Sequence, residues 1–271
     1  MMRALYTAAT GMRAQQTNVD NISNNLSNVN TVGYKQEKTE FKSLLYQTIQ
    51  TRTTTANGEE KPIPAQTGLG TRVASTTSIY TQGATLASEN ATDFAIVGDG
   101  FFAVRGADNE VYYTRAGNFV WAEGNQGLTL TTSDGYPVLD TNRQPITLPQ
   151  GITGESVTVS QDGSFSYKNA EGVTVDMNRS FGLFQFNNPS GLEKIGDNLL
   201  EETEASGAAL NERTTATLTP SQVRQKYLEA SNVQVADEMV NLIIAQRAYQ
   251  LNSKAITTSD EMLEQANNLR R

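Results

Sequence analysis

The sequence predicts a mixed fold, in which an all-β central domain carries long N- and C-terminal α-helices that pair in a coiled-coil-like core. Three observations favour this fold class. Apolar residues recur every seven positions near the N-terminus, and a second series of the same kind lies near the C-terminus. Between them, short β-type runs alternate with turn residues.

The N-terminal pattern occupies two heptad positions of one predicted helix. The first position holds Leu5, Met12, Val19 and Leu26, and the second holds Ala8, Gln15, Ile22 and Val29. Such a narrow apolar seam is typical of a helix that packs against another helix. A helix of about 27 residues would be roughly 40 Å long.

The C-terminal pattern repeats this theme. Its series is Leu228, Val235, Leu242, Tyr249, Ile256 and Leu263, widened by Met239, Ile243 and Ala266. Residues 219–222, Thr-Pro-Ser-Gln, would cap a helix that starts there, but the β-branched stretch 231–235 favours a start near residue 234. The seam could be covered by pairing within one chain or between subunits, and the pattern alone leaves both open.

The middle of the chain has the short apolar runs and the turn residues that are typical of β structure. The predicted strands are 94–97, 101–104, 111–114, 128–130, 157–159 and 181–186, and tight turns are predicted at 98–100, 133–135 and 161–163. Residues 51–70 are rich in Thr, Gly and Pro, which predicts an extended or flexible segment.

These patterns divide the chain into three predicted regions. Residues 1–30 with 232–271 form a terminal helical core domain. Residues 31–84 with 200–231 form an extended or β-type connecting region, and residues 85–199 form a β-rich outer domain.

Composition argues against several classes of function. The 271 residues carry a net charge of −8, with Lys and Arg scattered singly, which disfavours nucleic acid as a partner. The absence of His and Cys removes the commonest general base, the thiolate nucleophile and the usual metal ligands. Carboxylates such as Asp93, Asp99 and Asp134 are the remaining enzyme candidates, and the last two stand beside Gly in turns. We therefore expect no catalytic, cofactor or metal site.

The end of the N-terminal helix carries a distinctive run. Residues 24–35 read Asn-Asn-Leu-Ser-Asn-Val-Asn-Thr-Val-Gly-Tyr-Lys. Asn tolerates left-handed backbone and Gly33 permits a positive φ, so the chain can leave the helix sharply. The run resembles the signature of the flagellar rod and hook family. The signature positions are Asn24, Asn25, Asn28, Gly33, Tyr34 and Lys35.

Three further blocks resemble this family, in the family's order: residues 93–102, residues 113–119, and residues 227–233 continued by 238–249. The resemblance therefore covers both ends and the start of the middle. Residues 44–49, the Thr/Gly/Pro stretch up to Gly70 and the chain length resemble a rod member better than the larger hook protein.

The resemblance implies a structural, non-enzymatic axial subunit that stacks helically in the bacterial flagellar basal body. The implied partners are copies of itself, proximal rod and hook subunits, basal-body ring proteins and the flagellar type III export apparatus. The implied location spans the periplasm and cell wall after export without a signal peptide. The predicted assembly seam is Leu5, Met12, Val19, Ile22, Leu26, Val235, Met239, Leu242, Tyr249, Ile256 and Leu263.

Two alternatives remain open. One is a proximal rod or hook-type subunit of the same family. The other, from a different class, is a β-rich surface adhesin or carbohydrate-binding module on a helical stalk. Such a module would expose an aromatic cluster, and the sole tryptophan, Trp121, is more simply explained as a core or domain-edge residue.

Overall fold

The computed structural model describes residues 2–50, 65–124, 127–149, 151–169, 173–215 and 217–269. Its contacts divide the chain into two units. The helical unit comprises residues 1–27, 37–78 and 234–271, and the β unit comprises residues 28–36 and 79–233. The three-region organisation predicted from the sequence stays a prediction.

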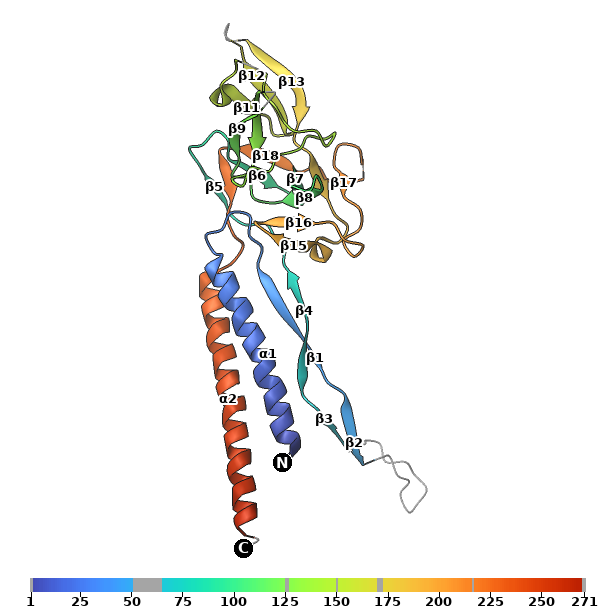
Figure 1. The fold of residues 1–271 in the computed structure, drawn as a ribbon, viewed down its shortest axis with the longest axis vertical. Helices are drawn as coiled ribbons and strands as arrows, with labels where there is room; N and C mark the ends of the chain where they lie inside the picture. Colours follow the sequence, from blue (N-terminus) through green and yellow to red (C-terminus); the bar gives the residue numbers. More distant parts are fainter. Residues whose placement is uncertain are drawn as a thin grey trace. The chain divides into compact units, whose positions relative to one another are not determined.

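The helical unit contains two long helices and a two-stranded ribbon. Helix α1 (Met2–Ser27) and helix α2 (Val235–Asn268) pack against each other and run in opposite directions (Figure 1). The helix start near residue 234 is confirmed, because the alternative start at 219–222 falls beside a strand instead. The helices contact each other as predicted, whereas a coiled-coil geometry for this contact stays a prediction.

The ribbon in the helical unit is antiparallel. Strand β1 (Glu37–Ser43) pairs with β4 (Thr71–Ser78), and β2 (Tyr46–Gln50) pairs with β3 (Ala65–Gly68). Backbone bonds from Leu44 N to Gly70 O and from Leu69 N to Leu45 O join the two pairs into one ribbon. The sequence predicted an extended or flexible segment at residues 51–70. Residues 65–68 of this segment form β3, and residues 51–64 lie outside the described part of the chain.

The β unit is built from several small antiparallel sheets. The largest has the order β15-β16-β8-β7-β14-β17, a second has the order β11-β12-β13, and the pairs β9–β10, β6–β18 and β5–β19 complete the unit. The bounds are β5 Thr85–Ala87, β6 Phe94–Val97, β7 Phe101–Arg105, β8 Val111–Thr114, β9 Val120–Gly124, β10 Gly127–Thr131, β11 Val157–Val159, β12 Ser164–Lys168, β13 Thr174–Ser180, β14 Leu183–Gln185, β15 Glu193–Gly196, β16 Leu199–Glu201, β17 Leu210–Asn211, β18 Gln222–Gln225 and β19 Tyr227–Glu229. Two short 3₁₀ turns, η1 (Gly154–Ser156) and η2 (Pro189–Gly191), lie between strands.

The hydrophobic core of the described chain lies in the β unit. One cluster gathers Phe94, Phe102, Phe119, Phe165 and Phe181 with aliphatic neighbours, and a second gathers Phe101, Tyr113, Phe184 and Phe186. Their rings meet mostly edge to face at centroid separations of 4.7–6.2 Å, a geometry that adds to plain area burial. Each strand predicted from the sequence is present in this unit, so the mixed fold class is confirmed.

Candidate assembly site

The predicted seam residues all lie on α1 or α2, and the helical unit covers them incompletely. Ile22 is buried, whereas Leu5, Met12, Val19, Leu26, Leu242, Ile256 and Leu263 are half-buried. Val235, Met239 and Tyr249 are exposed, with Met239 retaining 53% of its accessible surface. One chain alone therefore leaves part of the seam unburied, and its role in assembly stays a prediction.

A second heptad series, missed by the sequence analysis, lies on the face of α2 that meets α1. Glu238, Ala245 and Ser259 are buried, and Asn252 occupies the remaining position of this spacing. Glu238 accepts a hydrogen bond from Asn25 Nδ2, and Asn252 lies against Gly11, where an added Cβ would come within 2.8 Å of its amide nitrogen. Small and polar residues therefore lie at the contact between the two helices of one chain.

Helix α2 also presents an exposed apolar face near its N-terminal half. Its members are Val235, Met239, Val240, Ile243, Ile244 and Leu251, which expose 41–69% of their surface. A groove of about 380 Å³ between the helices, lined by Gln16, Val19, Gln246, Tyr249 and Gln250, lies on the same helix pair. Apolar residues gathered on one helix face without a partner are typical of a protein interface.

The signature residue Asn25 fastens the end of α1 to the start of the ribbon. Its side chain bonds both backbone groups of Glu37: Nδ2 donates to the carbonyl oxygen at 2.8 Å, and Oδ1 accepts from the backbone N–H at 2.9 Å. A neighbouring bond from Asn21 Nδ2 to Thr39 Oγ1 measures 2.8 Å. Asn24 is exposed, and Asn28 Oδ1 accepts a bond from Thr31 in the turn that follows. Asn25 and Asn28 therefore help to hold the end of α1 and the turn that follows it.

The signature residues Gly33, Tyr34 and Lys35 are buried in the β unit. Gly33 has φ +69°, and a Cβ there would come within 2.6 Å of Ala116 N, so both conformation and space require glycine. Its N–H donates to Glu229 O. The predicted sharp exit from the helix at Gly33 is thus supported by a positive φ at this residue.

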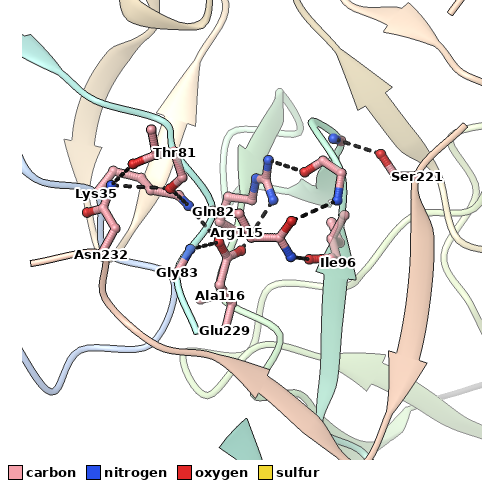
Figure 2. Close-up of polar contacts among 12 residues, drawn as sticks. Lys35, Thr81, Gln82, Gly83, Ile96, Arg115, Ala116, Ser221, Glu229 and Asn232 are labelled. Carbon is pink, nitrogen blue, oxygen red and sulfur yellow. Dashed lines mark hydrogen bonds and ion pairs between the residues drawn. The ribbon is translucent and has the colours of Figure 1, made fainter. Parts of the chain in front are cut away.

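Lys35 enters a buried ion cluster with Glu229 and Arg115 (Figure 2). Lys35 Nζ lies 2.6 Å from Glu229 Oε1, and Arg115 Nη1 lies 3.2 Å from Glu229 Oε2. Glu229 is fully buried, and Gly83 N–H also donates to its Oε1 at 3.0 Å. Burial lowers the pKa of Lys35, and the attraction of Glu229 opposes that shift.

Arg115 extends the cluster to the Gly98-Asp99-Gly100 turn between β6 and β7. Its Nη2 donates to Gly98 O at 2.7 Å, and its guanidinium lies 4.9 Å from the centroid of the Phe101 ring. On the other side of the turn, Gly100 N–H donates to Ser221 Oγ, whose hydroxyl donates to the buried Glu212. The predicted turn is thus held between two buried polar networks, and Figure 2 shows Arg115 of the first and Ser221 of the second.

Asn232 joins its own segment of the β unit to two others by hydrogen bonds. Its Oδ1 accepts from Gln36 N at 2.7 Å, and its Nδ2 donates to Ile79 O at 2.8 Å and to Thr81 O at 3.2 Å. Arg115, Glu229 and Asn232 lie inside blocks that resemble the family, yet their roles were not predicted. These roles could have been suspected from the sequence, because charged and amide side chains stand in these blocks among otherwise small or apolar residues.

The carboxylates considered as enzyme candidates differ in their surroundings. Asp93 is buried and accepts bonds from Ser88 Oγ and Asn90 Nδ2, whereas Asp99 and Asp134 are exposed at turns. Within the described residues, no group of three or more acidic side chains is arranged to hold a metal ion. None of the described helices is long and apolar enough to cross a membrane.

Three family models match the chain. Residues 5–35 match the flagella basal body rod protein model, residues 95–167 match the flagellar hook protein FlgE/F/G D1 domain, and residues 224–269 match the flagellar basal body rod FlgEFG protein C-terminal model. The matched ranges include nearly all of α1 with the signature run, the chain from β6 to β12, and all of α2.

Curated relatives are similar to the chain along its whole length. It is 44% identical to the flagellar basal-body rod protein FlgG of Borreliella burgdorferi, with 100% of both chains covered. It is 41% identical to the protein of that name from Agrobacterium fabrum, over 96% of this chain and 97% of the relative. Identity to the Bacillus subtilis protein of that name is 40%, with 100% of both chains covered.

Proposed function

The chain belongs to the flagellar basal-body rod protein family and is a structural subunit of the bacterial flagellar basal body; on this premise we propose that it polymerises helically into the distal rod. In that role it would transmit torque along the driveshaft to the hook. The relatives give no support to an adhesin on a helical stalk. They are named as rod proteins, and nothing about them indicates catalysis.

The observation that carries the proposal is the exposed apolar face of α2, defined above by Val235, Met239, Val240, Ile243, Ile244 and Leu251. Fully burying an aliphatic side chain stabilises an assembly by about 1.5–3 kcal/mol, so these half-exposed residues leave a considerable gain for a neighbouring subunit to realise. Helix–helix packing between copies would also fill the groove beside Val19 and Tyr249.

As a basal-body component, the chain assembles with other rod and hook components. We infer more specific neighbours from its proposed position: copies of itself around the axis, a proximal rod subunit at one end, the hook at the other, and ring proteins outside. Export through the flagellar type III apparatus is part of the same proposal.

Ile244→Asp tests this function because Ile244 is 61% exposed and its replacement should leave the single chain folded. We expect the variant to be absent from isolated basal bodies and the cells to be non-motile, since a carboxylate would be buried without a partner at the interface. Thr257→Asp, which adds the same charge at an exposed site of α2 beyond Leu251, the last member of the apolar face, should still be incorporated.

Circular dichroism and the fluorescence of Trp121 would verify that both variants fold. A complete rod built from the Ile244→Asp protein would show that this face is not an interface. Failure of both variants would instead mean that any added charge on α2 blocks assembly, which would also contradict the assignment.

A further inference from the structure

A surface cleft of about 650 Å³ lies in the β unit, and all of its lining residues belong to that unit. Its wall is formed by the loop before β6, by strand β9, by the turn η1 and by the end of β18. The side chains and glycine used below are Glu89, Asn90, Trp121, Gly154, Glu155 and Lys226. This volume is within the range of small-molecule sites in proteins.

Trp121 gives the cleft an aromatic wall. Part of its ring packs on the larger hydrophobic cluster, and another part lines the cleft. Its buried indole Nε1 has no hydrogen-bond partner among the described residues. Gly154 passes the ring edge so closely that a Cβ there would come within 2.2 Å of Cδ1. A glycine at this point therefore permits the ring to occupy its place in the wall.

The polar groups of the cleft carry both signs of charge. Glu89, Glu155 and Lys226 are exposed, and among the described residues no ion pair joins the ammonium group to either carboxylate. Asn90 adds an exposed amide. The two carboxylates outnumber the ammonium group and so disfavour a phosphate or another anion, and a lipid chain would leave these polar groups unsatisfied.

A neutral ring with hydroxyl groups satisfies all of these constraints. Its apolar face can lie against the indole, while its hydroxyls donate to carboxylates and accept from ammonium and amide groups. We propose that this cleft binds a short neutral glycan, with one sugar ring against Trp121. The site is additional to the rod function and does not make the chain an adhesin.

The fluorescence of Trp121 tests this proposal directly, because Trp121 is the only tryptophan in the chain. Dilute full-length protein would be titrated with tri-N-acetylchitotriose and, separately, with maltotriose. A saturable change with either sugar in the millimolar range or below is expected. Absence of a saturable change with both probes would overturn the proposal.

Substitutions in and beside the cleft test whether the sugar binds there. Glu155→Gln should weaken binding about tenfold, the effect of losing one charge-assisted hydrogen bond. Gly154→Ala should weaken it at least as much by displacing the ring. Glu123→Gln, at an exposed acid of β9 outside the cleft, is the matched control and should bind normally.

Undiminished binding by the Glu155→Gln variant would place the sugar elsewhere and overturn the assignment, whether or not the glycine variant folds. A change in Trp121 fluorescence with protein concentration alone, without a sugar effect, would also overturn it. In that case the cleft would be covered by a segment of another copy.

Discussion

At the residue scale, contacts with Glu229 explain the presence of Lys35 and Gly33 in the signature run. Glu229 meets both, through its carboxylate and its backbone carbonyl respectively. Lys35, Arg115 and Glu229 thus place two cations and one anion in a buried site. Removing the anion costs stability because the two cations would stay buried without a partner of opposite charge.

Replacing Glu229 by Gln should therefore destabilise the β unit by about 3–5 kcal/mol. Thermal unfolding followed by Trp121 fluorescence at neutral pH would measure the effect. Asp162→Asn is the control, because its bond to Arg213 joins side chains that are 65% and 47% exposed, and such a pair contributes only about 0–1 kcal/mol. Equal, small effects of both substitutions would mean that the cluster does not stabilise the fold.

The sequence indicated the members of this cluster but not their pairing. Gly33 and Lys35 could be singled out because the run around them resembles a known signature. Glu229 is 194 positions from Lys35 along the chain, and nothing in a single sequence connects the two. A buried charge partner of this kind is a property of the tertiary fold, which local pattern does not encode.

At the element scale, helix and strand positions follow from period, whereas their partners do not. The apolar runs at 94–97 and 101–104 are strands β6 and β7, as predicted. Yet β6 pairs with β18 and β5 pairs with β19, across more than a hundred residues. Register between such distant segments depends on the assembled core, so composition and alternation could not supply it.

The same limit applies to the helices. The heptad series correctly located α1 and α2, but it left open which residues of the two helices face each other. Glu238, Ala245 and Ser259 are the buried positions of α2, because small side chains and the bond to Asn25 fill the contact with α1. A polar residue at heptad spacing resembles a surface residue until its partner is known.

Asn25→Ala should loosen the helical unit selectively. The change leaves both backbone groups of Glu37 without their side-chain partner and removes the bond to Glu238. We expect a loss of about 2–3 kcal/mol. In the described part of the chain both α-helices belong to the helical unit, so circular dichroism follows that unit, while Trp121 follows the β unit.

The expected result is a lower transition temperature for helix loss with an unchanged fluorescence transition. Ser23→Ala, at an exposed position of α1, is the control and should change neither. A coincident shift of both transitions would mean that the two units unfold together, and the selective role of Asn25 would then be wrong.

At the scale of the whole molecule, burial is distributed unequally between the two units. Both hydrophobic clusters of the described chain belong to the β unit. The helical unit buries mainly small or polar side chains, such as Ala8, Ala14 and Ala245, and all of its larger apolar residues on α1 and α2 except Ile22 are half-buried or exposed. Because helices gain most of their stability from packing an apolar face, α1 and α2 should be marginally stable in a free subunit.

Limited proteolysis of the dilute full-length protein should therefore remove the terminal helices first and leave a resistant β unit. Local opening exposes backbone to a protease, and its free energy is lowest where few large apolar side chains are buried. In isolated rods the same helices should resist cleavage, since neighbouring subunits would cover the exposed face of α2. Helices that resist equally in both states would mean that pairing within one chain already suffices, and that assembly adds no order to the ends.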